Sequence, residues 1–194
     1  IGYYSDLLEA AKTQTKTADL VSMKHYTPPQ KIQKTEKRIA LIVGANESTT
    51  LYLLRHIEEY RRRHPRIKVQ VRRSLSSKIP NEILDGDLEL GLISYDPGDE
   101  RIVSRVIYKD RLTFVLSPEH PLAGREDVSI TELGAETFIA HNVISPYRQV
   151  VLREFQRHKV PLKMDVEMPT VESIRRLVQR NEGVAFLPKL CVEQ

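Results

Sequence analysis

Uninterrupted apolar runs alternate with amphipathic stretches along most of this chain, and this alternation constrains the fold most strongly. Residues 39–43 read IALIV and residues 88–93 read LELGLI, and each run has the length of one strand. A strand without polar alternation is buried on both faces, as in a parallel sheet that helices cover. Apolar residues from Leu51 to Tyr60 recur at helical spacing after the first run. The order strand, helix, strand, helix, strand predicts an α/β fold with a parallel sheet.

The second half of the chain continues this alternation with further short elements. Helices are expected to begin after Ser129, Ser145 and Thr170, because serine and threonine are favoured N-cap residues. Pro146 suits the first helical position, and Glu132 completes a capping box with Ser129. The strands predicted here lie at residues 101–110, 111–117, 137–141, 162–168 and 184–188.

The N-terminal region differs from the rest of the chain in composition. Residues 5–23 show an imperfect helical stripe, and the prediction there is a helix that is stable only against a partner. Residues 24–37 are polar and contain two prolines, which indicates a linker. The chain begins at Ile1 without an initiator methionine, so it is expected to be a fragment of a longer protein.

Composition excludes some classes of protein and leaves others open. The chain has 194 residues and a net charge of +4, which is too weak by itself to indicate nucleic-acid binding. The basic run at 61–63 is interpreted as a solvated helix end. A lone cysteine, Cys191, permits no disulfide within the chain and suits a reducing cytoplasm; we expect it to be a core residue. No apolar stretch approaches the length of a membrane span, so we expect no membrane association.

Sequence signatures of catalysis, cofactors and metals were sought without success. The chain has no GxxxxGK[ST], GxGxxG or GxSxG motif, and its histidines never form HxxxH. We therefore expect no catalytic residue, no cofactor and no metal site. An enzyme remains a weak alternative, for which His141 with Glu47 is the one pair to check.

Four polar turns follow predicted strands and precede predicted helices, at residues 44–49, 74–77, 140–145 and 169–170. In an open parallel sheet, ligands bind outside the carboxyl ends of the strands. Helix N-termini at that edge offer backbone N–H groups and a partial positive charge, which favour an anion. Each serine or threonine there has two interpretations: it caps its helix, or it turns its hydroxyl to a ligand.

The ordered set of segments resembles the effector-binding domain of LysR-type transcriptional regulators. The segments are the opening stretch from Arg38, "ILDGDLELGLIS", "FVLSPEHPLAGREDVSITEL" and the closing "PTVESIRRLVQRNEGVAFLP", which together span about 38–188. Two departures are Glu89 in place of an aspartate and Glu182 at an apolar position. The resemblance implies a two-lobed, type II periplasmic-binding-protein-like fold with parallel-type sheets and two crossing strands.

The resemblance also implies a division into lobes. Residues 1–23 would be the tail of a linker helix and 24–37 a linker. Lobe one would comprise 38–98 together with 168–194, incomplete at its C-terminus, and lobe two 99–167. "LSPEHPLAG" at 116–124 would end a strand of lobe two, with Pro118 and Pro121 stopping the sheet and His120 as a structural turn residue.

The function implied by the resemblance is effector sensing by a bacterial cytoplasmic transcription factor, without enzymatic activity. A small anionic molecule would bind in the cleft between the lobes. The intact protein would be a dimer or tetramer, and a winged helix-turn-helix absent from this chain would bind DNA. A periplasmic solute-binding protein of the same fold is the alternative. The implied ligand-binding residues are Asn46, Ser48, Ser76, Ser77, Ser94, Asn142, Ser145, Thr170 and Val171.

Overall fold

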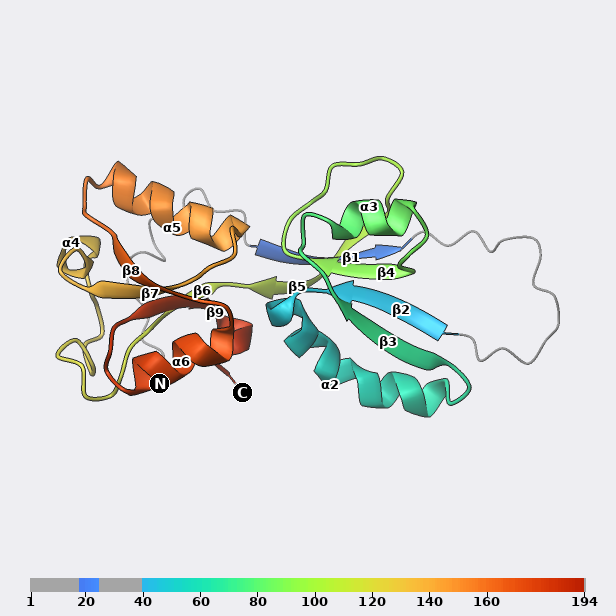
Figure 1. Ribbon diagram of the computed structural model, residues 1–194, viewed down its shortest axis with the longest axis horizontal. Coiled ribbons are helices and arrows are strands. Elements are labelled where there is room, and N and C mark those ends of the chain that lie inside the picture. The colour runs from blue at the N-terminus through green and yellow to red at the C-terminus, as the bar shows by residue number, and fades with distance from the viewer. Residues whose placement is uncertain (1–17, 25–39, 194) are drawn as a thin grey trace. The chain divides into compact units, whose positions relative to one another are not determined.

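The computed structural model describes residues 18–24 and 40–193 (Figure 1). Side chains are described for residues 40–193. Residues 25–37 of the expected linker and 5–17 of the expected N-terminal helix lie outside the described residues, and Lys24, expected in the linker, ends strand β1 (Ala18–Lys24). The chain divides into two compact units. We call Asp19–Lys109 the N-terminal unit and Asp110–Gln194 the C-terminal unit.

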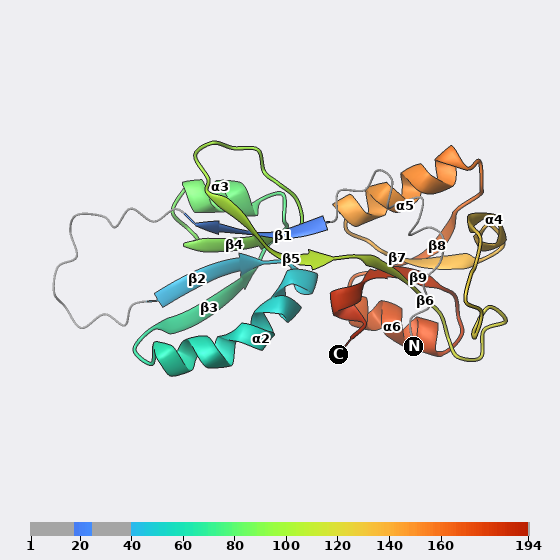
Figure 2. The same cartoon turned by 180° about the vertical axis from the view of Figure 1, so that it is seen from behind.

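The N-terminal unit is a five-stranded sheet in the order β3-β2-β4-β1-β5. Strand β2 pairs in parallel with both β3 and β4, as the sequence predicted. The helices α2 and α3 lie on opposite faces of this sheet (Figures 1 and 2). The elements are β1 (Ala18–Lys24), β2 (Ala40–Ala45), α2 (Glu47–Arg63), β3 (Lys68–Arg73), α3 (Ile79–Leu84), β4 (Leu90–Ile93) and β5 (Ser104–Asp110).

Strand β1 corrects the prediction for the N-terminal region. The helix expected at 5–23 is wrong for residues 18–23, which form a strand antiparallel to β4 in a register that pairs Val21 with Ile93. The physical reason is that β4 has a second edge, whose backbone groups β1 satisfies by sheet pairing. The apolar stripe read as a helix was imperfect, so this long-range pairing overrides it.

An aliphatic cluster forms the core of the N-terminal unit. It consists of Ile79, Leu88, Ile93 and Ile102, each no more than 7% exposed. Gly44 of β2 lies directly under this cluster, because a Cβ at that position would meet Leu88 Cδ1 at 2.3 Å. A side chain at position 44 would therefore require the Leu88 side chain to move.

The C-terminal unit has two pairs of strands between helices. Strand β6 pairs antiparallel with β9, β7 pairs in parallel with β8, and a bridge from Phe138 to Val184 joins the pairs. Helices α5 and α6 lie on opposite faces of these strands (Figures 1 and 2). The elements are β6 (Leu112–Val115), α4 (Ile130–Leu133), β7 (Thr137–His141), α5 (Pro146–Arg157), β8 (Lys163–Met168), α6 (Val171–Gln179), β9 (Ala185–Pro188) and the 3₁₀ turn η1 (Lys189–Cys191).

Aromatic rings dominate the core of the C-terminal unit. Phe138 stacks on Phe186 with ring centroids 5.5 Å apart and meets Phe155 edge-on at 5.4 Å. Phe114 contacts Phe186 from β6 at 5.3 Å. Cys191 is 1% exposed, which confirms its expected place in the core.

The division between the units differs from the lobes that the resemblance implied. Residues 168–194 were expected in lobe one, but they belong to the C-terminal unit with 110–167. Val184 is fully buried in the aromatic core, and α6 packs on β7, β8 and β9, so burial of apolar surface holds this segment there. Residues 99–109 were expected in lobe two, but β5 joins the five-stranded sheet of the N-terminal unit.

The segment LSPEHPLAG forms a turn that His120 fixes from inside. Its Nδ1 accepts the Leu122 N–H at 3.2 Å, and its Nε2 lies 3.1 Å from the carboxylate of Glu136. The Ser117 hydroxyl, 1% exposed, accepts the Glu119 N–H. These contacts confirm a structural role for His120 and show why the chain between the two prolines needs a polar side chain turned inward.

Candidate functional site

The carboxyl ends of β2 and β3 bring two predicted site residues into contact. Asn46 follows β2 and is the N-cap of α2, because its Oδ1 accepts the Thr49 N–H at 2.8 Å. Its Nδ2 donates to Ser76 Oγ at 2.7 Å. The polar edge of the N-terminal unit is therefore organised by hydrogen bonds between neutral side chains.

Two residues that the sequence argument missed complete this edge. Thr49 is 2% exposed; its Oγ1 accepts the Asn46 N–H at 2.9 Å and lies 3.3 Å from the Leu92 carbonyl. The Tyr95 hydroxyl donates to the Ser76 carbonyl at 3.0 Å, and burial raises the pKa of Tyr95. The spacing of Asn46 and Thr49, a capping box, was a signal for the first residue; the second follows β4 as a polar aromatic residue directly after a strand.

The remaining predicted site residues of this unit are not part of the Asn46–Ser76 contact. Ser76 rather than Ser77 makes the contact with Asn46, and Ser77 is exposed. Ser48 lies half-buried in the first turn of α2, and Ser94 is 6% exposed just after β4.

In the C-terminal unit the predicted residues lie where β7 and β8 end. Ser145 caps α5 by accepting the Arg148 N–H at 3.2 Å, and Thr170 caps α6 by accepting the Ser173 N–H at 3.1 Å. The Asn142 N–H donates to the Met168 carbonyl at 3.0 Å, which joins the ends of the two strands. Val171, 7% exposed, is buried under the first turn of α6 and belongs to the core.

Arg148 places a charge at this second edge. Its Nη1 donates to the carbonyl of His141, the last residue of β7, at 3.0 Å, and its Nη2 donates to Glu167 Oε1 of β8 at 2.6 Å. Its side chain is 23% exposed, compared with 45% for that of Glu167. In the other unit Glu47 has its carboxylate 3.8 Å from the Arg73 guanidinium.

These contacts decide between the two interpretations of the polar turns. Asn46, Ser145 and Thr170 all serve as N-caps, so each satisfies one of the N–H donors that a helix start leaves over. Capping takes one of the four N–H groups at each start, and the helix dipole still favours negative charge there. At these edges the Asn46–Ser76 contact joins neutral groups, whereas the Arg148–Glu167 contact joins opposite charges.

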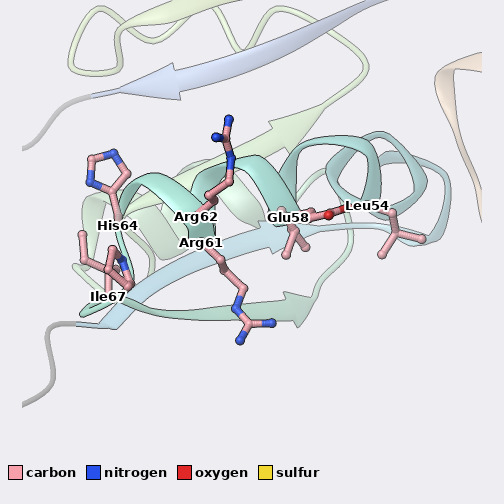
Figure 3. Close-up of a pocket in the computed structure, with 8 residues that line it drawn as sticks. Leu54, Glu58, Arg61, Arg62, His64 and Ile67 are labelled. Atoms are coloured by element: carbon pink, nitrogen blue, oxygen red, sulfur yellow. The ribbon is translucent and has the colours of Figure 1, made fainter.

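A pocket of about 470 Å³ lies beside the C-terminal half of α2 and is another candidate ligand site. It is lined by Leu54, Ile57, Glu58, Arg61, Arg62, His64, Pro65 and Ile67. Figure 3 shows the side chains of Arg61 and Arg62 pointing away from each other, and Arg62 pairs with Glu59. The cations do not converge on one point, so the basic run is an exposed helix end, as predicted.

The described residues contain neither a cluster of metal ligands nor a membrane-spanning helix. Within residues 18–24 and 40–193, no three histidine, cysteine, aspartate or glutamate side chains gather as metal ligands would. None of the helices in that part of the chain combines the length and apolar character needed to cross a bilayer.

Curated proteins and solved structures resemble this chain. Probable RuBisCO transcriptional regulators of Cyanidium caldarium and Porphyra purpurea are each 29% identical over 154 residues, which cover 76% of this chain and 49% of the relative. The chain therefore spans about half the length of the curated relatives it matches.

Solved structures share the fold. The regulatory domain of Synechocystis PCC6803 CcmR in complex with 2-PG matches with a TM-score of 0.72 and 22% identity, over 80% of this chain and 74% of that one. The BenM effector-binding domain with its effector benzoate matches with a TM-score of 0.67 and 20% identity, over 78% and 70%. These matches confirm the predicted α/β, periplasmic-binding-protein-like fold.

The family model for the LysR substrate binding domain matches residues 35–194. That range contains every described element except β1, including both polar edges. Members are domains of transcription regulators, not enzymes. The chain belongs to the LysR substrate-binding domain family.

Proposed function

We propose that this chain senses a small anionic effector for a bacterial, cytoplasmic LysR-type transcription regulator. The observation that carries the proposal is the arrangement of helix starts at the carboxyl ends of strands. Three of them, at Asn46, Ser145 and Thr170, are capped and preceded by a parallel strand. Carboxyl ends of parallel strands are where ligands bind in open α/β sheets, and helix N-termini favour anions.

In this proposal, the polar edge of each unit would supply groups that recognise the effector. Asn46 and Ser76 would offer neutral donors and acceptors, and the edge around Ser145 and Thr170 would add N–H groups with a positive partial charge. Each helix terminus contributes about 0.3–1 kcal/mol toward an anion. Relatives whose structures were solved with 2-PG and with benzoate support an acidic ligand.

The whole regulator would bind DNA through a winged helix-turn-helix outside this chain and would assemble as a dimer or tetramer. The family match and the transcriptional regulators among the curated relatives support this part of the proposal. In such an assembly, effector binding would change the geometry of the paired domains and thereby the spacing of the DNA-binding parts.

Calorimetric titration tests the proposed ligand class. Benzoate, 2-PG and the neutral amide benzamide would be titrated into the protein at constant ionic strength. We expect an acid to bind more tightly than the amide, and Asn46→Ala to weaken acid binding. Benzamide binding as tightly as benzoate, or tight binding of cations alone, would contradict the proposal.

A further inference from the structure

We infer that Arg148 and Glu167 determine ligand charge at the C-terminal unit: an anionic ligand takes the Nη2 donor of Arg148 by displacing the Glu167 carboxylate. The inference rests on the proposed function and adds to it a residue pair and a mode of selection. Glu167 stands in for the ligand's carboxylate, since it occupies Nη2 of Arg148 at 2.6 Å.

The backbone around Arg148 fixes where its guanidinium lies. Arg148 is the third residue of α5, and its N–H is held by the cap residue Ser145. Its Nη1 is held by the carbonyl of His141, at the carboxyl end of β7. The guanidinium is therefore anchored at the edge of the unit by contacts that do not involve Glu167.

Glu167 is the more exposed member of the pair. Its side chain is 45% exposed, whereas that of Arg148 is 23% exposed. Loss of the ion pair would leave the carboxylate hydrated and would free the Nη2 donor of Arg148 for another acceptor. A ligand carboxylate offers that donor the same chemistry as Glu167 does.

The exchange separates ligands by charge. A carboxylate or phosphate can replace Glu167 at Arg148, and the displaced side chain returns to water. A neutral ligand cannot compensate the guanidinium and leaves the internal pair closed. Exposed ion pairs are weak, so removing the competing carboxylate should improve anion binding about two- to fivefold.

The variant Glu167→Gln tests this, because it removes the competing charge and keeps the shape. Affinities for benzoate, 2-PG and benzamide would be measured by calorimetry at constant ionic strength. Glu126→Gln is the matched control, since Glu126 is an exposed residue of the same unit and the change in net charge is identical. We expect Glu167→Gln to bind the acids about two- to fivefold more tightly than Glu126→Gln does, with benzamide unchanged.

The double variant Arg148→Gln with Glu167→Gln should lose this gain. A purely structural ion pair would instead lower the melting temperature of Glu167→Gln without changing acid affinity, which would overturn the inference and leave the proposed function standing. A gain that persists in the double variant would overturn it as well. If neither acid binds the wild type or any variant, the proposed function falls and the inference falls with it.

Discussion

The two units place similar elements at their polar edges but hold them by different chemistry. In the N-terminal unit, Asn46 and Ser76 meet as neutral groups 2.7 Å apart. In the C-terminal unit, Arg148 and Glu167 meet as opposite charges 2.6 Å apart. The cores differ too, because the first unit packs aliphatic side chains and the second packs phenylalanine rings.

The Asn46–Ser76 and Arg148–Glu167 contacts should respond differently to salt. A neutral edge keeps its hydrogen bonds at any salt concentration and can recognise hydroxyl or carbonyl groups of a ligand. An ion-paired edge responds to salt and to ligand charge, because exposed pairs are screened and weak.

The first prediction concerns the aromatic core of the C-terminal unit and has the largest expected change in stability. Phe155→Ala should lower the free energy of unfolding by about 3–5 kcal/mol, because the ring is 1% exposed and its loss leaves a cavity. Chemical denaturation gives the magnitude, and hydrogen exchange shows where protection is lost. We expect amides of the C-terminal unit to lose protection first. Leu152→Ala on the same helix is the control, since Leu152 is 38% exposed and should cost far less. Equal loss of protection in both units would mean that they unfold together.

The second prediction concerns Asp110, the first residue of the C-terminal unit. Asp110 is 4% exposed, and its Oδ1 accepts the N–H groups of Arg111 at 2.8 Å and Leu190 at 3.3 Å. Asp110→Ala would leave these donors without the carboxylate, so the free energy of unfolding should fall by about 1–3 kcal/mol. Urea denaturation at neutral pH measures the effect. A change within error would show that water replaces the carboxylate.

Asp110 also gives the C-terminal unit a pH dependence. Burial raises the pKa of Asp110, so the folded state holds this proton more tightly than the unfolded chain does. The free energy of unfolding should therefore fall as pH rises from the ordinary carboxyl value, about 4, through the raised folded value. Asp110→Asn should flatten this slope, whereas Asp165→Asn at an exposed position of the same unit should keep it. Denaturation at several pH values compares the slopes, and an unchanged slope in Asp110→Asn would refute the assignment.

Removing the helix caps should lower stability by a smaller amount, and the losses at the two edges can be compared. Asn46→Ala and Ser145→Ala should each cost about 0.5–2 kcal/mol of stability. Asn46→Ala should cost more, because it also removes the contact with Ser76. Thermal unfolding with hydrogen exchange of the first-turn amides measures both. A larger loss in Ser145→Ala would show that the ion-paired edge depends more on its cap.

The last and smallest expected effect is a difference in salt dependence between the coupling energies of the two contacts. A double-mutant cycle on Arg148 and Glu167 should give a coupling of about 0.2–1 kcal/mol at low salt that shrinks at 1 M salt. The matching cycle on Asn46 and Ser76 should give a coupling that salt leaves unchanged. Stability measurements at both salt concentrations supply the two cycles. Equal salt dependence would remove the distinction between a neutral and a charged edge.

Local patterns in the sequence allowed much of this arrangement to be predicted. The caps at Ser145 and Thr170 were predicted next to predicted strands, and each prediction needed only neighbouring residues. The contact between Asn46 and Ser76 could be expected as a shared edge but not as a hydrogen bond, because it joins residues 30 apart in sequence. Thr49 and Tyr95 were missed for the same reason, since Leu92 and Ser76 supply their partners.

Local patterns were enough to predict the α/β class, the parallel direction of β2, β3 and β4 and the starts of the helices capped by Ser145 and Thr170, because hydrophobic period and capping act over a few residues. Only the tertiary structure decided that residues 18–24 form a strand beside β4 and that 168–194 pack in the C-terminal unit. It also decided that Arg148 is held by Glu167. Each of these depends on a partner distant in the chain, which a local pattern cannot identify, and on burial that exists only once the sheet has formed.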